Sequence, residues 1–286
     1  MKQNLLQQLT DRMPTFSKGQ RQIAGYILDH YDRAAYMTAS KLGAEVKVSE
    51  STVVRFADEL GFSGYPELQR ALQELAKTNL TAAQRMEVAD NLLQKDTVLE
   101  KVLLGDADKI RHTLDSLDKD AFYAAVDKIV NARNIYIIGS RSSASLAGFL
   151  TLHFRMMFDN VRNVELTSGS EMFEQILDIG KNDVIIAISF PRYSKRTVRA
   201  VRFAHHAGAD VVSLTDSAAS PIATDCDQLL IAHSDMASFV DSLVAPLSII
   251  NAMVVAVAMS KHDQVADRLR RLEKIFDEYD VYDKNN

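Results

Sequence analysis

The sequence predicts an α/β protein: an all-helical N-terminal domain joined by further helices to a doubly wound domain built on a five-stranded parallel sheet. Three observations support this prediction. Up to about residue 77, apolar residues recur at helical spacing. From Asn134 onwards, short β-branched runs alternate with helix-length segments. The chain has 286 residues, which exceeds the roughly 100 to 200 residues of one typical domain.

Helical periodicity defines the expected N-terminal domain, residues 1–77. Ser17 can cap a first helix, and apolar residues then fall on one of its faces: Ile23, Ala24, Ile27, Leu28 and Tyr31. Thr38 can cap a shorter helix, and Ser49 can cap the next one after a tight connection at Lys47. Two short helices are therefore expected to follow the first long one.

The helix that begins after Ser49 has two distinct faces. Residues at positions i, i+3, i+4 and i+7 are expected to face the core: Val53, Phe56, Ala57 and Leu60. The residues left outside lie near the helix start: Ser51, Thr52, Val54 and Arg55. Two short helices, the second with hydroxyls and an arginine near its N-terminus, fit a helix-turn-helix that reads DNA. The same spacing also fits a small helical bundle with a polar outer face.

Five residues are candidate DNA contacts: Lys47, Ser49, Ser51, Thr52 and Arg55. Hydroxyl groups can bond to base edges or phosphates, and an arginine can bind a guanine or a phosphate. Lys47 stands where a glycine would ease the turn between the two helices.

The rest of the chain divides into a linker and a sheet domain. Residues 78–109 keep a helical pattern but become more polar, which indicates a helical linker. Residues 110–286 are expected to form the sheet domain with a C-terminal helix. Its five predicted strands are the runs "NIYIIG", "VRNVEL", "DVIIAIS", "ADVVSLT" and "DQLLIA". Because helix-length or turn-rich segments separate these runs, we predict a parallel sheet covered on both faces.

The first predicted strand ends at Gly139 and leads into a loop suited to an anion. Ser140, Arg141 and Ser143 follow at the start of an amphipathic helix that runs from about Ser142 to Phe158. Backbone N–H groups, hydroxyls, one cation and the helix dipole would meet there, and phosphate suits this chemistry. The alternative is a serine-rich loop that only caps the helix.

The third predicted strand ends in a similar way. Ser189 closes the strand, and Arg192 and Ser194 precede the next helix. Arginine beside hydroxyls at a helix N-terminus favours contact with an oxyanion. The basic residues that follow are better explained as a solvated helix face: Lys195, Arg196 and Arg199.

Other polar groups have simpler explanations. Glu171 and Glu174 follow the second strand and could bond to sugar hydroxyls, although carboxylates in a first turn often only complement the dipole. His205 and His206 precede Gly208 and fit a helix C-terminus. Two serines after the fourth strand, Ser217 and Ser220, fit turn formation.

Composition limits the classes of function. The net charge of −5 argues against a nonspecific polyanion coat, but residues 1–77 carry 10 Lys and Arg against 9 Asp and Glu, while the remainder carries 23 against 29. The only cysteine, Cys226, excludes an intrachain disulfide and multi-cysteine zinc sites. The apolar run 239–259 is interrupted by Asp241, Pro246 and Asn251, which favours a buried core helix over a membrane span. We expect a cytoplasmic protein without a metal site or membrane contact.

The N-terminal part resembles a known family. The run "VSESTVVRFADELGFSGYPELQRAL" is similar to the RpiR-type (MurR/RpiR) transcriptional regulators, in which V-S-x-x-T-V-x-R-F opens the recognition helix and L-G-F-x-G-[FY] follows it. The similarity extends back through "FSKGQRQIAGYIL" and covers roughly residues 1–77. Lys47 is its main departure and concerns only the local turn.

The second part resembles the sugar isomerase (SIS) domain of the same regulators over about residues 110–260. The resemblance assigns phosphate-binding serines to Ser143 in the first loop and Ser189 in the second, and a final hydroxyl to Ser194. Arg141 stands in place of the second glycine of the first loop, and "FPRY" replaces the usual x-S-G-E core of the second. The resemblance therefore implies a phosphate-bearing ligand bound in a different way, or another anionic metabolite.

This resemblance implies a DNA-binding regulator of carbohydrate metabolism that senses a phosphorylated sugar or related anion. Its partners would be double-stranded operator DNA and further copies of the chain, as a homodimer or homotetramer, with no cofactor. The alternative is an aldose-ketose phosphate isomerase on the same sheet domain. Such chemistry needs a positioned base, and Glu171 is the candidate.

Overall fold

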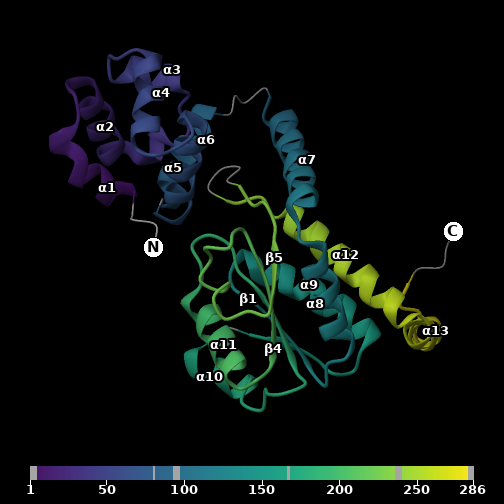
Figure 1. Cartoon of the computed structure of the whole chain (residues 1–286). Helices are drawn as coiled ribbons and strands as arrows, with labels where there is room; N and C mark the ends of the chain where they lie inside the picture. Colours follow the sequence, from purple (N-terminus) through teal and green to yellow (C-terminus); the bar gives the residue numbers. More distant parts are fainter. Residues whose placement is uncertain (1–4, 80, 93–96, 166–167, 236–239, 283–286) are drawn as a thin grey trace. The chain divides into compact units, whose positions relative to one another are not determined.

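The computed structural model describes residues 5–79, 81–92, 97–165, 168–235 and 240–282 (Figure 1). The chain forms two compact units. The first comprises residues 1–101 together with 236–241, and the second comprises 102–235 and 242–286.

The first unit is helical, as predicted. Its elements are α1 (Leu5–Arg12), the 3₁₀ turn η1 (Met13–Thr15), α2 (Lys18–Ala34), α3 (Ala39–Glu45), α4 (Glu50–Glu59), α5 (Tyr65–Asn79) and α6 (Ala82–Leu92). The predicted caps are confirmed: the side chains of Ser17, Thr38 and Ser49 accept backbone N–H bonds at the starts of α2, α3 and α4. The predicted apolar stripe of α4 is also confirmed, because Val53 and Phe56 are fully buried.

The turn between α3 and α4 explains the unusual Lys47. This residue adopts φ 59°, the left-handed conformation that glycine most often supplies at a helix end. The N–H groups of Lys47 and Val48 donate to the carbonyls of Ala44 and Gly43, a pairing that closes helix α3. A Cβ on Gly43 would lie 2.8 Å from the Val48 carbonyl oxygen, so glycine lets the two helices approach.

The second unit contains the predicted sheet. Its strands are β1 (Ile135–Gly139), β2 (Val161–Val164), β3 (Val184–Ile188), β4 (Asp210–Thr215) and β5 (Gln228–Ile231), all parallel, in the order β2-β1-β3-β4-β5. From β1 the chain moves outward to β2, and from β3 it moves the other way to β4 and β5. The crevice between β1 and β3 is therefore the topological switch point, where sheets of this kind bind their ligands.

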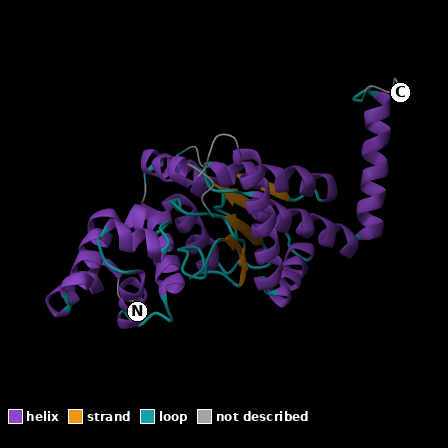
Figure 2. Cartoon of the chain, turned by 90° about the horizontal axis from the view of Figure 1, so that it is seen from above, coloured by secondary structure: helices purple, strands orange, loops and turns teal. Residues whose placement is uncertain are grey.

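Helices cover both faces of this sheet, as the apolar runs predicted (Figure 2). The helices of this unit are α7 (Val98–Ser116, which starts in the first unit), α8 (Lys119–Val130), α9 (Ser142–Met157), α10 (Gly169–Gln175), α11 (Lys195–His206), α12 (Val244–Ser260) and α13 (His262–Glu278). Alternate strand residues point to opposite cores. Ile135 and Ile137 pack with α8, α9 and α12, while Tyr136 and Ile138 pack with α10 and α11.

The helix expected over 239–259 begins later than predicted. Residue 239 lies outside the described part of the chain, and α12 starts at Val244, which places Pro246 in the first turn where its missing N–H costs no hydrogen bond. Across the described residues, no single helix is long and apolar enough to cross a membrane. Helices α12 and α13 together have the required length and composition, but they meet at a bend of 102°.

A network of hydrogen bonds holds the amino-terminal edge of the sheet together. Asp183 is fully buried, and its carboxylate accepts bonds from Arg133 Nε and Nη2 at 2.9 and 2.6 Å, from Asn134 Nδ2 at 3.0 Å and from Gly180 N at 3.0 Å. Burial raises the pKa of Asp183, but the bonds from Arg133, Asn134 and Gly180 together outweigh this effect and leave the pKa below its usual value. Asn182 beside it adopts φ 72°.

Candidate functional site

The first candidate surface is the N-terminal end of α4. Four of the five predicted DNA contacts are exposed there, Lys47, Ser49, Ser51 and Arg55, and Thr52 is half-buried. Ser49 Oγ lies 2.9 Å from Ser51 Oγ and 2.8 Å from Thr52 Oγ1, so the three hydroxyls form one cluster. Ser49 is also occupied as the helix cap, because its Oγ accepts from Thr52 N. Ser51 is the member of this cluster best placed to reach outward.

Arg55 is held by the same helix turn. Its Nε donates to the carbonyl of Ser51 at 3.2 Å, which fixes the side chain along the surface of α4. The two terminal nitrogens of its guanidinium make no hydrogen bond or ion pair within the described part of the chain. They can therefore form the bidentate contact that arginine makes with a guanine edge or a phosphate.

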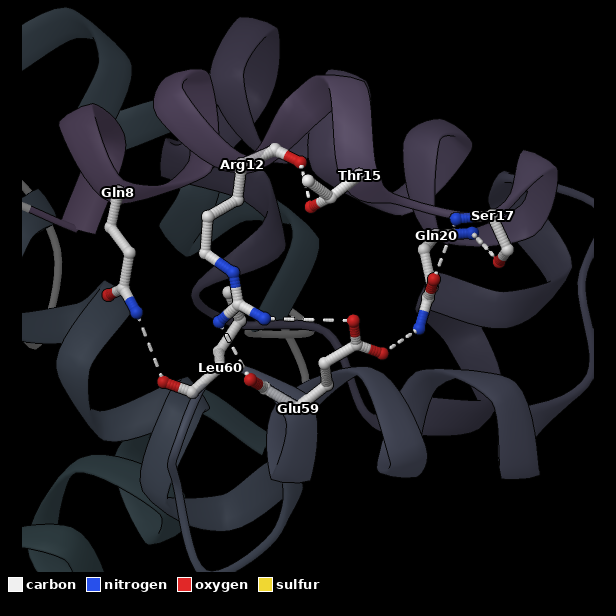
Figure 3. A network of polar contacts seen from close by, with 7 residues as sticks. All are labelled: Gln8, Arg12, Thr15, Ser17, Gln20, Glu59 and Leu60. Carbon is white, nitrogen blue, oxygen red and sulfur yellow. Dashed lines mark hydrogen bonds and ion pairs between the residues drawn. The ribbon is translucent and has the colours of Figure 1, made fainter.

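The opposite end of α4 is fixed to the helices before it (Figure 3). Gln8 Nε2 donates to the carbonyl of Leu60 at 3.1 Å, and Arg12 Nη1 donates to the carbonyl of Glu59 at 2.7 Å. The Glu59 carboxylate accepts from Gln20, which also completes the cap of α2 with Ser17. Because these bonds anchor its C-terminal carbonyls, α4 presents its N-terminal end as a rigid surface.

The second candidate surface lies at the switch point of the sheet. Gly139, the last residue of β1, is in register with Ile188, the last residue of β3, so Ser140 and Ser189 leave the sheet from neighbouring positions. A Cβ on Gly139 would lie 2.3 Å from the carbonyl oxygen of Ser143, and the missing side chain allows α9 to start directly above the strand. The two predicted loops therefore emerge side by side, above the N-termini of α9 and α11.

Three buried residues at this edge carry hydroxyls that make no hydrogen bond with the described residues. Ser143 and Ser189 are 4% and 3% exposed, and neither side chain makes a hydrogen bond among the described residues. Thr197, in the first turn of α11, is fully buried, and its Oγ1 has no partner either. Buried hydroxyls are normally bonded, so an open set at one edge points to a ligand that completes it. Ser194 has a different role, because its Oγ caps α11 by accepting from Thr197 N at 3.5 Å.

The two predicted arginines occupy backbone positions that suit glycine. Arg141 has φ 55° and ψ −123° as the N-cap of α9, and Arg192 has φ 65°. Both side chains are exposed. A non-glycine residue in such a conformation costs roughly 1–3 kcal/mol, and strain of this kind concentrates at functional sites. At both positions, where the resembled loops carry glycine, this chain keeps a backbone conformation typical of glycine and adds a guanidinium group.

Sequence reasoning missed Thr197 as a candidate. Its place three residues after the Ser194 cap was a signal for a hydroxyl in the first turn, but the sequence does not show which hydroxyls lack partners. It also missed a contact that holds the second loop, in which Tyr193 Oη donates to Asp216 Oδ1 at 2.8 Å. Asp216 directly follows β4, so this bond ties the second loop to the next strand.

The remaining candidates follow other strands of the sheet, and some of them have structural roles. Glu171 is exposed in the first turn of α10, which follows the outer strand β2. Ser217 Oγ accepts from Ala219 N, and Ser220 Oγ lies 2.8 Å from Thr215 Oγ1, as expected of turn formation. His205 and His206 end α11 before Gly208, whose φ is 84°, as the sequence indicated.

Comparisons with known proteins find matches to both parts of the chain. A family model described as a helix-turn-helix domain of the rpiR family matches residues 3–78, and a SIS domain model matches residues 128–256. The transcriptional regulator HexR of Pseudomonas aeruginosa is 27% identical over 277 residues, which is 95% of each chain. The match to a regulator thus extends over nearly the whole length of both proteins.

Two solved structures share the fold. The sugar isomerase domain of an RpiR transcription factor from Sphaerobacter thermophilus has a TM-score of 0.60 at 24% identity and covers 62% of this chain and 99% of that one. The Vibrio vulnificus NanR protein complexed with ManNAc-6P has a TM-score of 0.59 at 21% identity, over 96% and 98%. The chain therefore belongs to the RpiR family of helix-turn-helix transcriptional regulators, with a SIS domain behind its DNA-binding domain.

Proposed function

We propose that this regulator binds operator DNA through the N-terminal end of α4 and responds to a phosphorylated sugar, or a related anion, at the switch point between β1 and β3. The observation that carries the effector assignment is a set of three buried residues, Ser143, Ser189 and Thr197, whose hydroxyls make no hydrogen bond with the described residues; Thr197 Oγ1 is itself a buried atom. Phosphate oxygens accept hydrogen bonds from hydroxyls and from helix N-termini, and both meet at this edge. The complex of NanR with ManNAc-6P supports the assignment.

The DNA contact follows from the surface of α4. Arg55 supplies the cation, and Ser51 and Lys47 flank it as exposed donors. Thr52 is half-buried, and both its hydroxyl and its backbone N–H bond to the cap residue Ser49. The chain is acidic overall, but the positive and negative charges of its N-terminal domain nearly cancel. This domain would therefore contact operator DNA in the cytoplasm.

Ligand control requires that the effector favour one arrangement of the protein over another. An anion that binds more tightly to one arrangement shifts the population toward it, and the DNA affinity changes by the same coupling free energy. The effector acts as a ligand here and is released unchanged.

We propose a homodimer as the smallest DNA-binding form, because two half-sites require two recognition helices. Helix α7 carries an exposed apolar stripe at positions i, i+4, i+7 and i+11: Leu103, Ala107, Ile110 and Leu114. Beside it, Tyr123 of α8 is 62% exposed and lines a groove of about 280 Å³ between α7, α8 and α12. A second copy of the chain would cover this face, and further pairing would give a homotetramer.

An isomerase is the rival function, and it would need a positioned base. Proton transfer beside a carbonyl needs a base within hydrogen-bond reach of the substrate. Glu171, the candidate base, is exposed in the first turn of α10 after β2, and a relative that matches 95% of this chain is a transcriptional regulator. We therefore propose binding without turnover.

The DNA contact is tested with a duplex that the wild-type protein selects from a random library. Arg55→Ala should lower its affinity by at least tenfold, since one charged contact contributes about 1.5–3 kcal/mol. Arg33→Ala is the matched control, because Arg33 is an exposed arginine in the last turn of α2, outside the proposed DNA contact. Equal losses in both variants, or none in Arg55→Ala, would remove α4 from the reading surface.

The effector site is tested in the same assay with a panel of sugar phosphates. A member of the panel should change DNA affinity in the wild type, and Ser143→Ala with Ser189→Ala should abolish that response while DNA binding remains. A normal response in the double variant would place the site elsewhere. Turnover of any member that is lost in Glu171→Ala would establish the isomerase instead.

A further inference from the structure

We infer that the effector carries two anionic groups, a phosphate and a second carboxylate or phosphate, and that Arg141 and Arg192 bind the second one. This inference rests on the proposed function, since it names the chemical class of the ligand at the same site. It follows from the position, the partners and the backbone of the two arginines.

The two arginines reach the same edge of the sheet from neighbouring strands. Gly139 and Ile188 are register partners at the ends of β1 and β3, and the arginines follow them by two and four residues. Neighbouring strands lie about 4.8 Å apart, a distance that the long side chain of arginine easily spans. Both guanidinium groups can therefore approach one ligand above the switch point.

Neither guanidinium is compensated by the protein. Within the described ranges, Arg141 and Arg192 make no ion pair and no side-chain hydrogen bond. Five other arginines of this unit do pair with carboxylates: Arg111 with Asp108, Arg133 with Asp183, Arg202 with Asp225, Arg268 with Asp159, and Arg270 with Asp267. The loops at the switch point thus carry two positive charges without a protein counter-charge, in addition to hydroxyls that make no hydrogen bond with the described residues.

The backbone conformation at these two positions does not require arginine. At φ 55° and φ 65°, glycine would adopt either loop conformation without strain. Arginine adds no cap to α9, because Arg141 makes no side-chain hydrogen bond as its N-cap residue. The positive charge is the property that remains to explain its presence.

A single phosphate already has enough donors at this edge. The N-termini of α9 and α11 each offer backbone N–H groups and about half a positive charge. The hydroxyls of Ser143, Ser189 and Thr197 add three neutral donors. The two arginine cations are therefore more than one phosphate requires, and they are available for a second anionic group. Arginine binds a planar carboxylate or a phosphate in a bidentate geometry.

The test is calorimetric titration of the full-length protein with two matched pairs of probes. Glucose 6-phosphate is compared with 6-phosphogluconate, and fructose 6-phosphate with fructose 1,6-bisphosphate; the second member of each pair adds one anionic group. Wild-type protein should prefer the second member of at least one pair by about 10- to 100-fold, the contribution of one charge-assisted contact. The preference should weaken at high salt.

Two sets of variants separate charge from other causes. Arg141→Gln with Arg192→Gln removes the charge but keeps a polar side chain and the backbone strain, and should lower the preference at least fivefold. The corresponding double lysine variant keeps the charge and should restore most of the preference. Ser143→Ala should weaken both members of a pair by similar factors and retain the preference.

The outcomes distinguish this inference from the proposed function. If the probes bind but neither pair shows a preference, or if the glutamine variant keeps it, the second anion site is wrong while the effector site stands. If no probe binds, the phosphorylated-sugar assignment fails together with the inference.

Discussion

The two edges of the sheet treat their polar groups in opposite ways. At the amino-terminal edge, the buried carboxylate of Asp183 accepts four hydrogen bonds from Arg133, Asn134 and Gly180. At the carboxyl-terminal edge, Ser143 and Thr197 are buried residues whose hydroxyls make no hydrogen bond with the described residues, and Thr197 Oγ1 is itself a buried atom. The buried carboxylate at the first edge has its hydrogen-bond partners, whereas a buried hydroxyl at the second edge has none among the described residues.

Backbone strain follows the same division. Each edge has residues with positive φ, but Asn182 at the amino-terminal edge belongs to a residue type that tolerates this conformation. Arg141 and Arg192, at the carboxyl-terminal edge, are of a residue type that rarely adopts positive φ. We therefore propose that one edge serves stability, while the other accepts a cost in stability in return for binding the effector.

The largest effect is expected when the complete edge is broken. Asp183→Ala removes the acceptor for the Asn134 amide and the Gly180 N–H, and should lower the free energy of unfolding of the sheet domain by about 3 kcal/mol. Arg133 adds little to this loss, because its side chain is 58% exposed and stays solvated. Chemical denaturation of the full chain measures the loss.

The same carboxylate gives the stability a defined dependence on pH. Because the pKa of Asp183 is lower in the folded state than in the unfolded one, its contribution is complete above the unfolded value of about 4. The contribution is lost as the pH falls through the folded pKa. Asp183→Asn should therefore flatten the decline in stability below about pH 4, and an unchanged acid profile would show that the network does not carry it.

A matched pair of threonines isolates the missing partner. Thr197 and Thr215 are both fully buried, but Thr215 Oγ1 lies 2.8 Å from Ser220 Oγ, whereas Thr197 Oγ1 has no partner. Thr197→Val should raise the free energy of unfolding by about 1 kcal/mol and weaken effector binding, since a buried unpaired hydroxyl is replaced by a methyl group. Thr215→Val should lower it by about 1 kcal/mol. Thermal unfolding of both variants checks the opposite signs, and equal signs would contradict the assigned role of Thr197.

The local features of both units could be predicted from the sequence. Caps such as Thr38 and Ser49 act on backbone groups within three residues, and the strands appear as short β-branched runs, so neither needs tertiary information. The loops after β1 and β3 were also found, because glycine, serine and arginine at a strand end limit the chemistry.

The features that were missed depend on partners far along the chain. Asp183 resembles a surface residue beside a strand, and its burial becomes visible only once Arg133, 50 positions away, lies against it. The lack of a partner for Thr197 requires all neighbours to be in place. The late start of α12 was missed because the apolar run continues through the preceding loop.

The smallest effect tests whether strain was accepted for binding. Arg141→Gly relieves φ 55° and should raise the free energy of unfolding by about 1 kcal/mol, after allowance for the greater freedom of glycine in the unfolded chain. Asn182→Gly is the control at the other edge and should change stability by less than about 0.5 kcal/mol, because asparagine already tolerates φ 72°. If Arg141→Gly gains no stability, its loop conformation is unstrained; if it gains stability but keeps full effector affinity, the arginine does not serve the ligand. A gain in stability together with a loss of affinity is the result that ties the strain at this edge to binding.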